Sequence, residues 1–199
     1  IYSFTVTEDA SYVANFELNT YTISASANPS NGGTVNGGGT YNYGDNCTLT
    51  ATANTGYNFM NWTQEGTVVS TSAIYSFTVT SSGTYVANFG QNTYTITASA
   101  NPTEGGTVSG ASNYNYGSTC TLTATANAGY TFTSWTKDGT VVSTNAIYSF
   151  TVTEDASYVA NFELNGYTIT ATANPVEGGT VSGAGNYNYG STCSLTAKI

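Results

Sequence analysis

The chain repeats itself with a period of 73 residues, because the sequence around Tyr21 returns at Tyr94 and again at Tyr167. Residues 21–93 and 94–166 are identical at 50 of 73 aligned positions. Self-similarity at a fixed period is typical of stacked or strung architectures, in which each small unit performs the same structural task. The repeat therefore predicts serial modules rather than one domain built around a single centre.

The repeat boundaries divide the chain into four parts. Residues 1–20 match 147–166 at 19 of 20 positions, so they correspond to the last third of a unit. The four parts are the C-terminal part of a preceding repeat (1–20), two complete repeats (21–93 and 94–166) and the N-terminal part of a following repeat (167–199). We expect this sequence to be a segment of a longer array.

The composition argues against nucleic acid and anionic membranes as partners. Charged residues make up 7% of the chain, and eleven acids stand against two lysines, which gives a net charge of −9. Phosphate binding requires clustered Lys or Arg. No apolar run approaches the roughly 20 residues of a membrane span, so no membrane insertion is expected in this segment. A 14% aromatic content with many β-branched residues predicts a folded chain.

Alternation of apolar and polar residues predicts a unit made of short strands. The alternation is clearest from Tyr21 to Ala27 and from Cys47 to Ala53. Further strands are expected around Thr34-Val35, Tyr41 to Tyr43, Tyr57 to Trp62, Thr67 to Val69, Tyr75 to Val79 and Tyr85 to Phe89. No stretch has helical spacing. The predicted fold class is all-β: tandem β-sandwich-like modules of 73 residues, each with about six or seven short strands, in a linear array.

Two local features refine this picture. Tyr57 and Phe59 share one parity along their strand whereas Trp62 has the other, so a one-residue bulge near Met60-Asn61 is predicted. The pair Glu65-Gly66 is a tight-turn signal. The glycine-rich stretches at 32–33 and 37–39 follow no strand-to-helix pattern, so they are interpreted as turns with positive φ and not as phosphate-binding loops.

One cysteine occurs in each unit, so no disulfide can form within a unit. The alternation places Cys47 on the same strand face as Leu49 and Ala51, which predicts a buried thiol. The predicted buried thiols are Cys47, Cys120 and Cys193. Pairing between units, or a reducing habitat, stays open as an alternative.

The sequence offers little for catalysis. It contains no histidine, which removes the commonest general base and metal ligand. No Ser or Thr has a His or repeated Lys partner, and no pair of carboxylates recurs across a cleft. We therefore expect no enzyme activity, no catalytic residue, no metal and no cofactor.

Tyrosines are the candidate contact residues. They occur in pairs at positions i and i+2 beside a glycine: Tyr41 and Tyr43, Tyr114 and Tyr116, Tyr187 and Tyr189. Such rings can stack on a sugar or a partner protein, cap the core of their own module, or pack against an adjacent repeat or chain. The connections between repeats are short, with four residues at 17–20, 90–93 and 163–166, so limited bending is expected.

These motifs resemble a known family. The runs NPxxGGTV at 28–35, YNYG, CTLTATANxGYxFxxWT at 47–63 and TYVANF at 84–89 are similar to the divergent internalin B B-repeat, also grouped with Listeria-Bacteroides repeats. The resemblance implies tandem modules of secreted or wall-attached bacterial proteins, and a compact β-rich module that is β-grasp-like in some relatives. It transfers no catalytic residue.

Two functional hypotheses follow from these features. The first is an extracellular structural repeat protein that forms a semi-rigid stalk or fibre on a bacterial surface, whose partners are neighbouring repeats and copies of itself. The alternative is an adhesin module that binds host protein or glycan through Tyr41, Tyr43, Trp62 and their equivalents.

Overall fold

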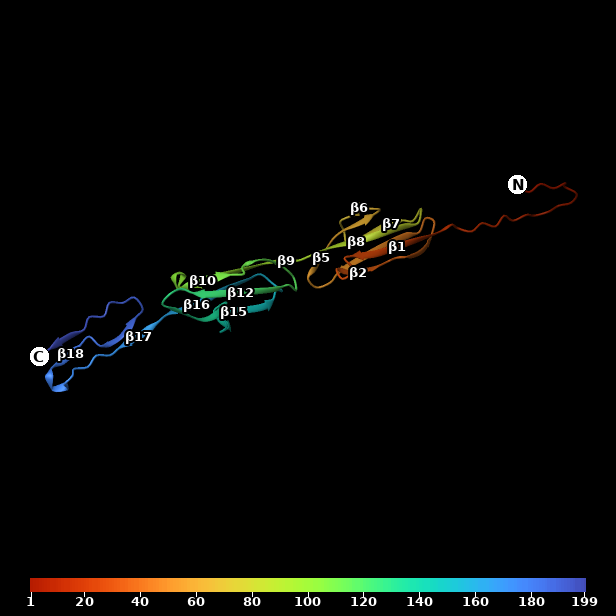
Figure 1. Cartoon of the computed structure of the whole chain (residues 1–199). Helices are drawn as coiled ribbons and strands as arrows, with labels where there is room; N and C mark the ends of the chain where they lie inside the picture. Colours follow the sequence, from red (N-terminus) through yellow and green to blue (C-terminus); the bar gives the residue numbers. More distant parts are fainter. The chain divides into compact units, whose positions relative to one another are not determined.

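The computed structural model describes all 199 residues, and their contacts divide into two compact units, residues 1–90 and 91–199. Each unit contains the hydrophobic core of one complete repeat, and Figure 1 shows the strands of each. Both units are built almost entirely from strands.

The first complete repeat has eight strands, one for each of the eight segments expected from alternation, against an estimated total of six or seven. They are β1 (Thr20–Asn28), β2 (Gly33–Asn36), β3 (Gly39–Asn42), β4 (Asn46–Ala53), β5 (Tyr57–Gln64), β6 (Thr67–Ser70), β7 (Ile74–Thr78) and β8 (Gly83–Gln91). Each segment predicted as a strand overlaps one of these eight. The all-β class is confirmed.

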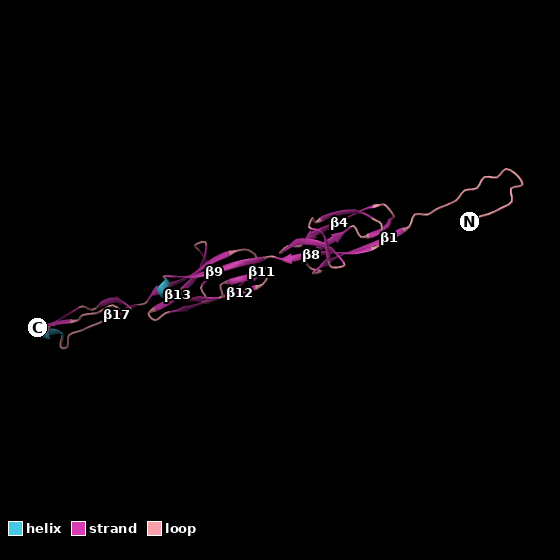
Figure 2. Ribbon diagram, turned by 90° about the horizontal axis from the view of Figure 1, so that it is seen from above, coloured by secondary structure: helices cyan, strands magenta, loops and turns pink.

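The second complete repeat has the same order of elements with one added 3-10 turn. It comprises β9 (Thr93–Asn101), η1 (Thr103–Gly105), β10 (Gly106–Ser109), β11 (Ser112–Asn115), β12 (Thr119–Ala126), β13 (Tyr130–Lys137), β14 (Thr140–Ser143), β15 (Ile147–Thr151) and β16 (Ala156–Leu164). Figure 2 shows strands and loops almost throughout. The structure has no helix with the length and apolar character needed to cross a bilayer.

Each complete repeat is a sandwich of two sheets. In the first repeat the larger sheet has the order β3-β1-β8-β5-β6 and the smaller has the order β2-β4-β7. The second repeat gives β11-β9-β16-β13-β14 and β10-β12-β15. In the larger sheet β1 pairs in parallel with β8, from Ile23 opposite Gly83 to Asn28 opposite Asn88. Alternation along a strand does not reveal this pairing, because it reports burial and not the direction of the neighbour.

The core lies between the two sheets. Strand β4 contributes Cys47, Leu49 and Ala51, as its alternation predicts, and β8 contributes buried side chains that include Tyr85 and Phe89. The second repeat buries the equivalent residues. Because all members of each core come from one repeat, each sandwich has the means to fold as a unit.

The predicted bulge is confirmed at the equivalent place in the second repeat. Strand β13 shifts register against β16 between Phe132 and Ser134, so that the extra residue is Thr133, the counterpart of Met60. The shift lets Phe132 and Trp135 face the same core, with ring centroids 6.0 Å apart, although three positions separate them.

The turn prediction is confirmed, and one glycine interpretation is wrong. Glu65 and Gly66 both have positive φ, 48° and 81°, as a two-residue hairpin turn of the primed type requires. Gly32 and Gly33, however, do not lie in the left-handed region, and of the stretch 37–39 only Gly37 does, with φ 100°. Positions 32 and 33 require glycine because the Phe89 side chain lies against both of them. A Cβ on Gly33 would overlap the Phe89 ring. Long-range packing, and not turn geometry, accounts for these two glycines.

The two terminal segments contain less structure. Residues 1–19 form no strand, although their near-copy at 147–165 forms β15 and β16. In the second complete repeat those strands pair with β9, β12 and β13. The last segment forms β17 (Gly166–Ile169), η2 (Val176–Gly178), β18 (Thr180–Ser182), β19 (Gly185–Asn188) and β20 (Thr196–Lys198).

Candidate functional site

The first tyrosine of each pair belongs to its own repeat. The hydroxyl of Tyr41 donates a hydrogen bond of 2.6 Å to the carbonyl oxygen of Gly37, and its half-buried ring packs against the core. Tyr114 makes the same 2.6 Å bond to Gly110, and Tyr187 bonds to Gly183. Of the three interpretations of the tyrosine pairs, capping of the module's own core therefore describes Tyr41 and Tyr114.

The thiols lie beside these tyrosines. Cys47 and Cys120 are fully buried, and their Sγ atoms lie 3.5 and 3.6 Å from the same glycine carbonyls. The hydrogen bond with Cys47, followed by burial, raises the pKa of Tyr41. Cys193 departs from the prediction of a buried thiol because it is only half-buried. The strand that covers Cys120, β15, has no counterpart after Cys193 in this sequence.

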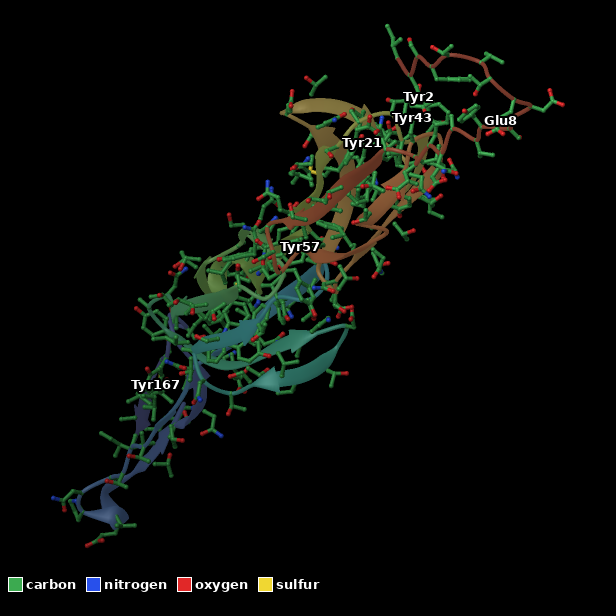
Figure 3. All side chains as sticks on the ribbon, turned by 90° about the vertical axis from the view of Figure 1, so that its right-hand side faces the viewer. Tyr2, Glu8, Tyr21, Tyr43, Tyr57 and Tyr167 are labelled. Atoms are coloured by element: carbon green, nitrogen blue, oxygen red, sulfur yellow. The ribbon has the colours of Figure 1, made fainter.

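The second tyrosine of each pair reaches the surface. Tyr43 is 55% exposed, and its ring centroid lies 6.4 Å from that of Tyr21, so the two rings mark one end of the repeat (Figure 3). Tyr116 lies equally far, 6.4 Å, from Tyr94. Of the residues predicted as contacts, Tyr43 and Tyr189 are exposed, whereas Tyr116 is half-buried like the first tyrosines.

In the third pair the second tyrosine contacts the preceding repeat. The ring of Tyr189 lies on the turn at Gly129, where a Cβ atom on the glycine would overlap the ring atoms Cγ, Cδ1 and Cε1. Gly129 has φ +82°, a left-handed conformation that glycine adopts without strain. Tyr189 is nevertheless 49% exposed, so one side of its ring meets the turn and the other meets solvent.

A single asparagine bridges the two repeats at the same place. Asn165 is the one residue between strands β16 and β17. Its N–H donates to the carbonyl of Gly129, and its own carbonyl accepts from the N–H of Tyr189, each at 2.8 Å. Its side-chain oxygen accepts a 2.6 Å hydrogen bond from Thr131. Asn165 is thus bonded to the preceding and the following repeat at once.

Asn165 and Gly129 were not among the residues predicted as contacts, although a signal was present. The three connections read ELNT, GQNT and ELNG, and asparagine is the residue that all three share, at Asn19, Asn92 and Asn165. The carbonyls of Asn19 and Asn92 accept from the N–H groups of Tyr43 and Tyr116, each at 2.8 Å. A constant residue within a variable connection marks a repeated backbone contact.

The indole rings proposed for an adhesin are not available. Trp62 and Trp135 are both 0% exposed, and their indole N–H groups donate to the carbonyls of Ala73 and Ala146 at 3.3 and 3.1 Å. The prediction that Trp62 and its equivalent could contact a host ligand is therefore wrong, because the bulge turns this ring into the core.

Few other features suggest chemistry. The structure contains one ion pair, between Lys137 and Glu154 at 2.5 Å, and it lies at the surface, where such pairs contribute little. No group of three or more His, Cys, Asp or Glu residues is arranged to hold a metal ion. The features of the surface that could serve a function are therefore the second tyrosines and the junction at Asn165.

The buried tyrosines give the fold a sensitivity to alkaline pH. Burial, followed by nearby Tyr75 and Cys47, raises the pKa of Tyr85, and burial is also the main cause of the raised pKa of Tyr158. A tyrosine whose folded pKa exceeds the ordinary value of 10.0 holds its proton better in the folded state. Its contribution to stability is complete below that value and is lost as the pH rises through the folded pKa.

We expect the free energy of unfolding, measured by urea titration with far-UV circular dichroism, to fall as the pH rises above about 10. Replacing both Tyr85 and Tyr158 with Phe removes these two groups, so the fall should become shallower in the double variant. An unchanged slope would contradict the assignment to these rings.

The repeats match one family of known proteins. A family model described as a divergent InlB B-repeat domain matches residues 22–93, 94–166 and 168–198. The comparisons with curated proteins and with solved structures gave no match.

Proposed function

Because the chain belongs to the divergent InlB B-repeat family, we propose that it is an extracellular structural repeat protein, part of a semi-rigid stalk or fibre on a bacterial surface. Its role is mechanical: it provides length and a fixed orientation. It is not an enzyme, and its partners are the neighbouring repeats of its own chain and copies of itself. The chain is a tandem all-β repeat protein of a family that is generally extracellular or surface-located.

The junction at Asn165 is the observation that carries the proposal. A flexible linker of several Gly or Ser residues leaves neighbouring modules free to rotate. Here one residue separates β16 from β17, and its backbone is hydrogen-bonded to the turn before it and to the strand end after it. A connection that is shorter than a turn and bonded on both sides transmits orientation from one repeat to the next.

The construction of each repeat supports the same role. Each sandwich has a separate core, so that load or damage in one repeat does not require the others to open. The polar faces of the strands carry many Thr, Ser and Asn residues and few charges. Such a surface stays hydrated while its net charge of −9 disfavours unspecific association between chains.

Electron microscopy of the native organism's surface material, labelled with antibodies against this chain, tests the proposal. We expect extended projections in which labelled epitopes recur with a constant axial spacing. Label confined to the cell interior, or to isolated globular particles, would overturn it.

The adhesin alternative is separated by a binding measurement on the same protein. Of the residues that the adhesin hypothesis names, the exposed second tyrosines are still available to a ligand. Tyr43 is the most exposed of the pair members at 55%. If Tyr43→Ala abolished binding of the purified chain to host glycans or matrix proteins, the adhesin role would replace the stalk role. Absence of any binding in the unmodified chain supports the stalk.

A further inference from the structure

The ring of Tyr189 packs directly on the backbone of Gly129. The ring occupies the space in which any side chain at position 129 would begin, so the turn offers a flat backbone surface to a flat aromatic face. The backbone of both residues is fixed by the same bridge, since Gly129 accepts from Asn165 and Tyr189 donates to it. Ring and turn therefore meet in a defined register.

We propose that the turn at Gly129 is a receiving surface for the next repeat, and that the ring of Tyr189 locks the two repeats in one orientation. The proposal deepens the stalk role, on which it rests, by naming the residues that stiffen a joint. The Asn165 bridge limits the orientation of the next repeat, but it acts at one point and leaves a residual pivot. A second contact displaced from that point, made by the tyrosine ring, opposes the pivot.

Glycine has two separable functions at this turn. Its φ of +82° alone would admit asparagine, which tolerates the left-handed region, whereas the ring of Tyr189 leaves no room for any Cβ. Gly139 provides the matched control, because it has φ +77° in the same repeat and no atom lies within 4 Å of the place a Cβ would occupy. Substitution by asparagine at the two positions separates the ring contact from the backbone requirement.

Joints between such repeats then follow a rule that is readable in their sequence. A joint is locked where the turn after the fourth strand carries glycine and the next repeat carries the second tyrosine of its YNYG motif. Substituting either partner converts a locked joint into a pivoting one, without loss of either sandwich. Stiffness along an array of this family would then follow from these two positions.

Nuclear magnetic resonance on the 199-residue chain tests the lock. In the unmodified protein we expect the Hα resonances of Gly129 to be shifted upfield by the Tyr189 ring, and residual dipolar couplings of β17 and β19 to fit one alignment tensor with those of residues 94–166. Tyr189→Ala should remove the Gly129 shift and reduce the β17 and β19 couplings at least about twofold. Tyr43→Ala, the equivalent change in the first repeat, should leave both measurements unaltered.

The asparagine variants complete the design. Gly129→Asn should reproduce the effect of Tyr189→Ala, and Gly139→Asn should not, while burial of Trp135 reports that the sandwich is intact in each. Equal couplings in Gly129→Asn and Gly139→Asn, or an unshifted Gly129 resonance in the unmodified chain, would overturn the lock. That outcome leaves the surface location and the axial spacing untouched, so it is distinguishable from failure of the stalk role.

Discussion

Trp135→Ala is expected to lower the free energy of unfolding of residues 94–166 by about 3–5 kcal/mol, the usual range for truncating a large buried aromatic ring. The indole is 0% exposed and contacts Phe132 at the centre of the second core. Its removal leaves a cavity between the two sheets, and these hydrogen-bonded sheets cannot approach each other to fill it. It also removes one of the two donors to the carbonyl of Ala146, which keeps the backbone N–H of Ala124.

The effect should stay within one repeat, because the cores are separate. The chain has two tryptophans, one in each complete repeat, so in this variant the fluorescence of Trp62 reports the first repeat alone while far-UV circular dichroism reports both. In urea we expect an early transition by dichroism and an unchanged transition by Trp62 fluorescence. Val141→Ala, at a position 56% exposed, serves as the surface control and should change stability by less than about 0.5 kcal/mol. A shift of the Trp62 transition by the same amount would contradict independent cores.

Gly110→Ala is expected to destabilise the same repeat by about 2–4 kcal/mol, from two causes that add. Gly110 has φ +97°, where a Cβ is strained by about 1 kcal/mol. The new methyl group would also overlap the carbonyl oxygen of Thr121, which is part of β12 and cannot rotate away. The carbonyl of Gly110 in addition accepts the hydroxyl of Tyr114, so a shift of this turn disturbs the tyrosine that caps the core.

Gly117→Ala is the matched control for this change. Gly117 has φ +79°, and no atom lies within 4 Å of the place a Cβ would occupy, so only the backbone strain of about 1 kcal/mol remains. Denaturation followed by tryptophan fluorescence measures both variants in a Trp62→Phe background, in which Trp135 is the only indole. Equal losses of stability would show that the close approach of Thr121 contributes nothing, contrary to the expectation.

The stability of each repeat bears on the proposed role. A stalk extends only if every repeat along it stays folded, so its weakest repeat sets the load that the array bears. In each sandwich, that resistance comes from one buried indole and from glycines that let strands approach closely. The locked joint then decides how far the stiffness of one repeat extends into the next.

The sequence by itself determined the architecture within a repeat to a large extent. Alternation along the segment at 47–53 identified both the strand and its buried face, because side chains of a strand alternate whatever its partner is. The parity conflict between Phe59 and Trp62 predicted the bulge for the same local reason. The period of 73 residues delimited the units and indicated the family resemblance.

Only the tertiary structure decided which surfaces meet. The parallel pairing of β1 with β8 joins segments 60 positions apart, from Ile23 opposite Gly83, and nothing local records the direction of such a partner. Position 33 requires glycine because the Phe89 ring packs against it, and position 129 requires glycine because a tyrosine of the next repeat packs against it. Backbone conformation and burial within a strand depend on residues that are close in sequence. Contacts between distant segments form only when the chain has folded.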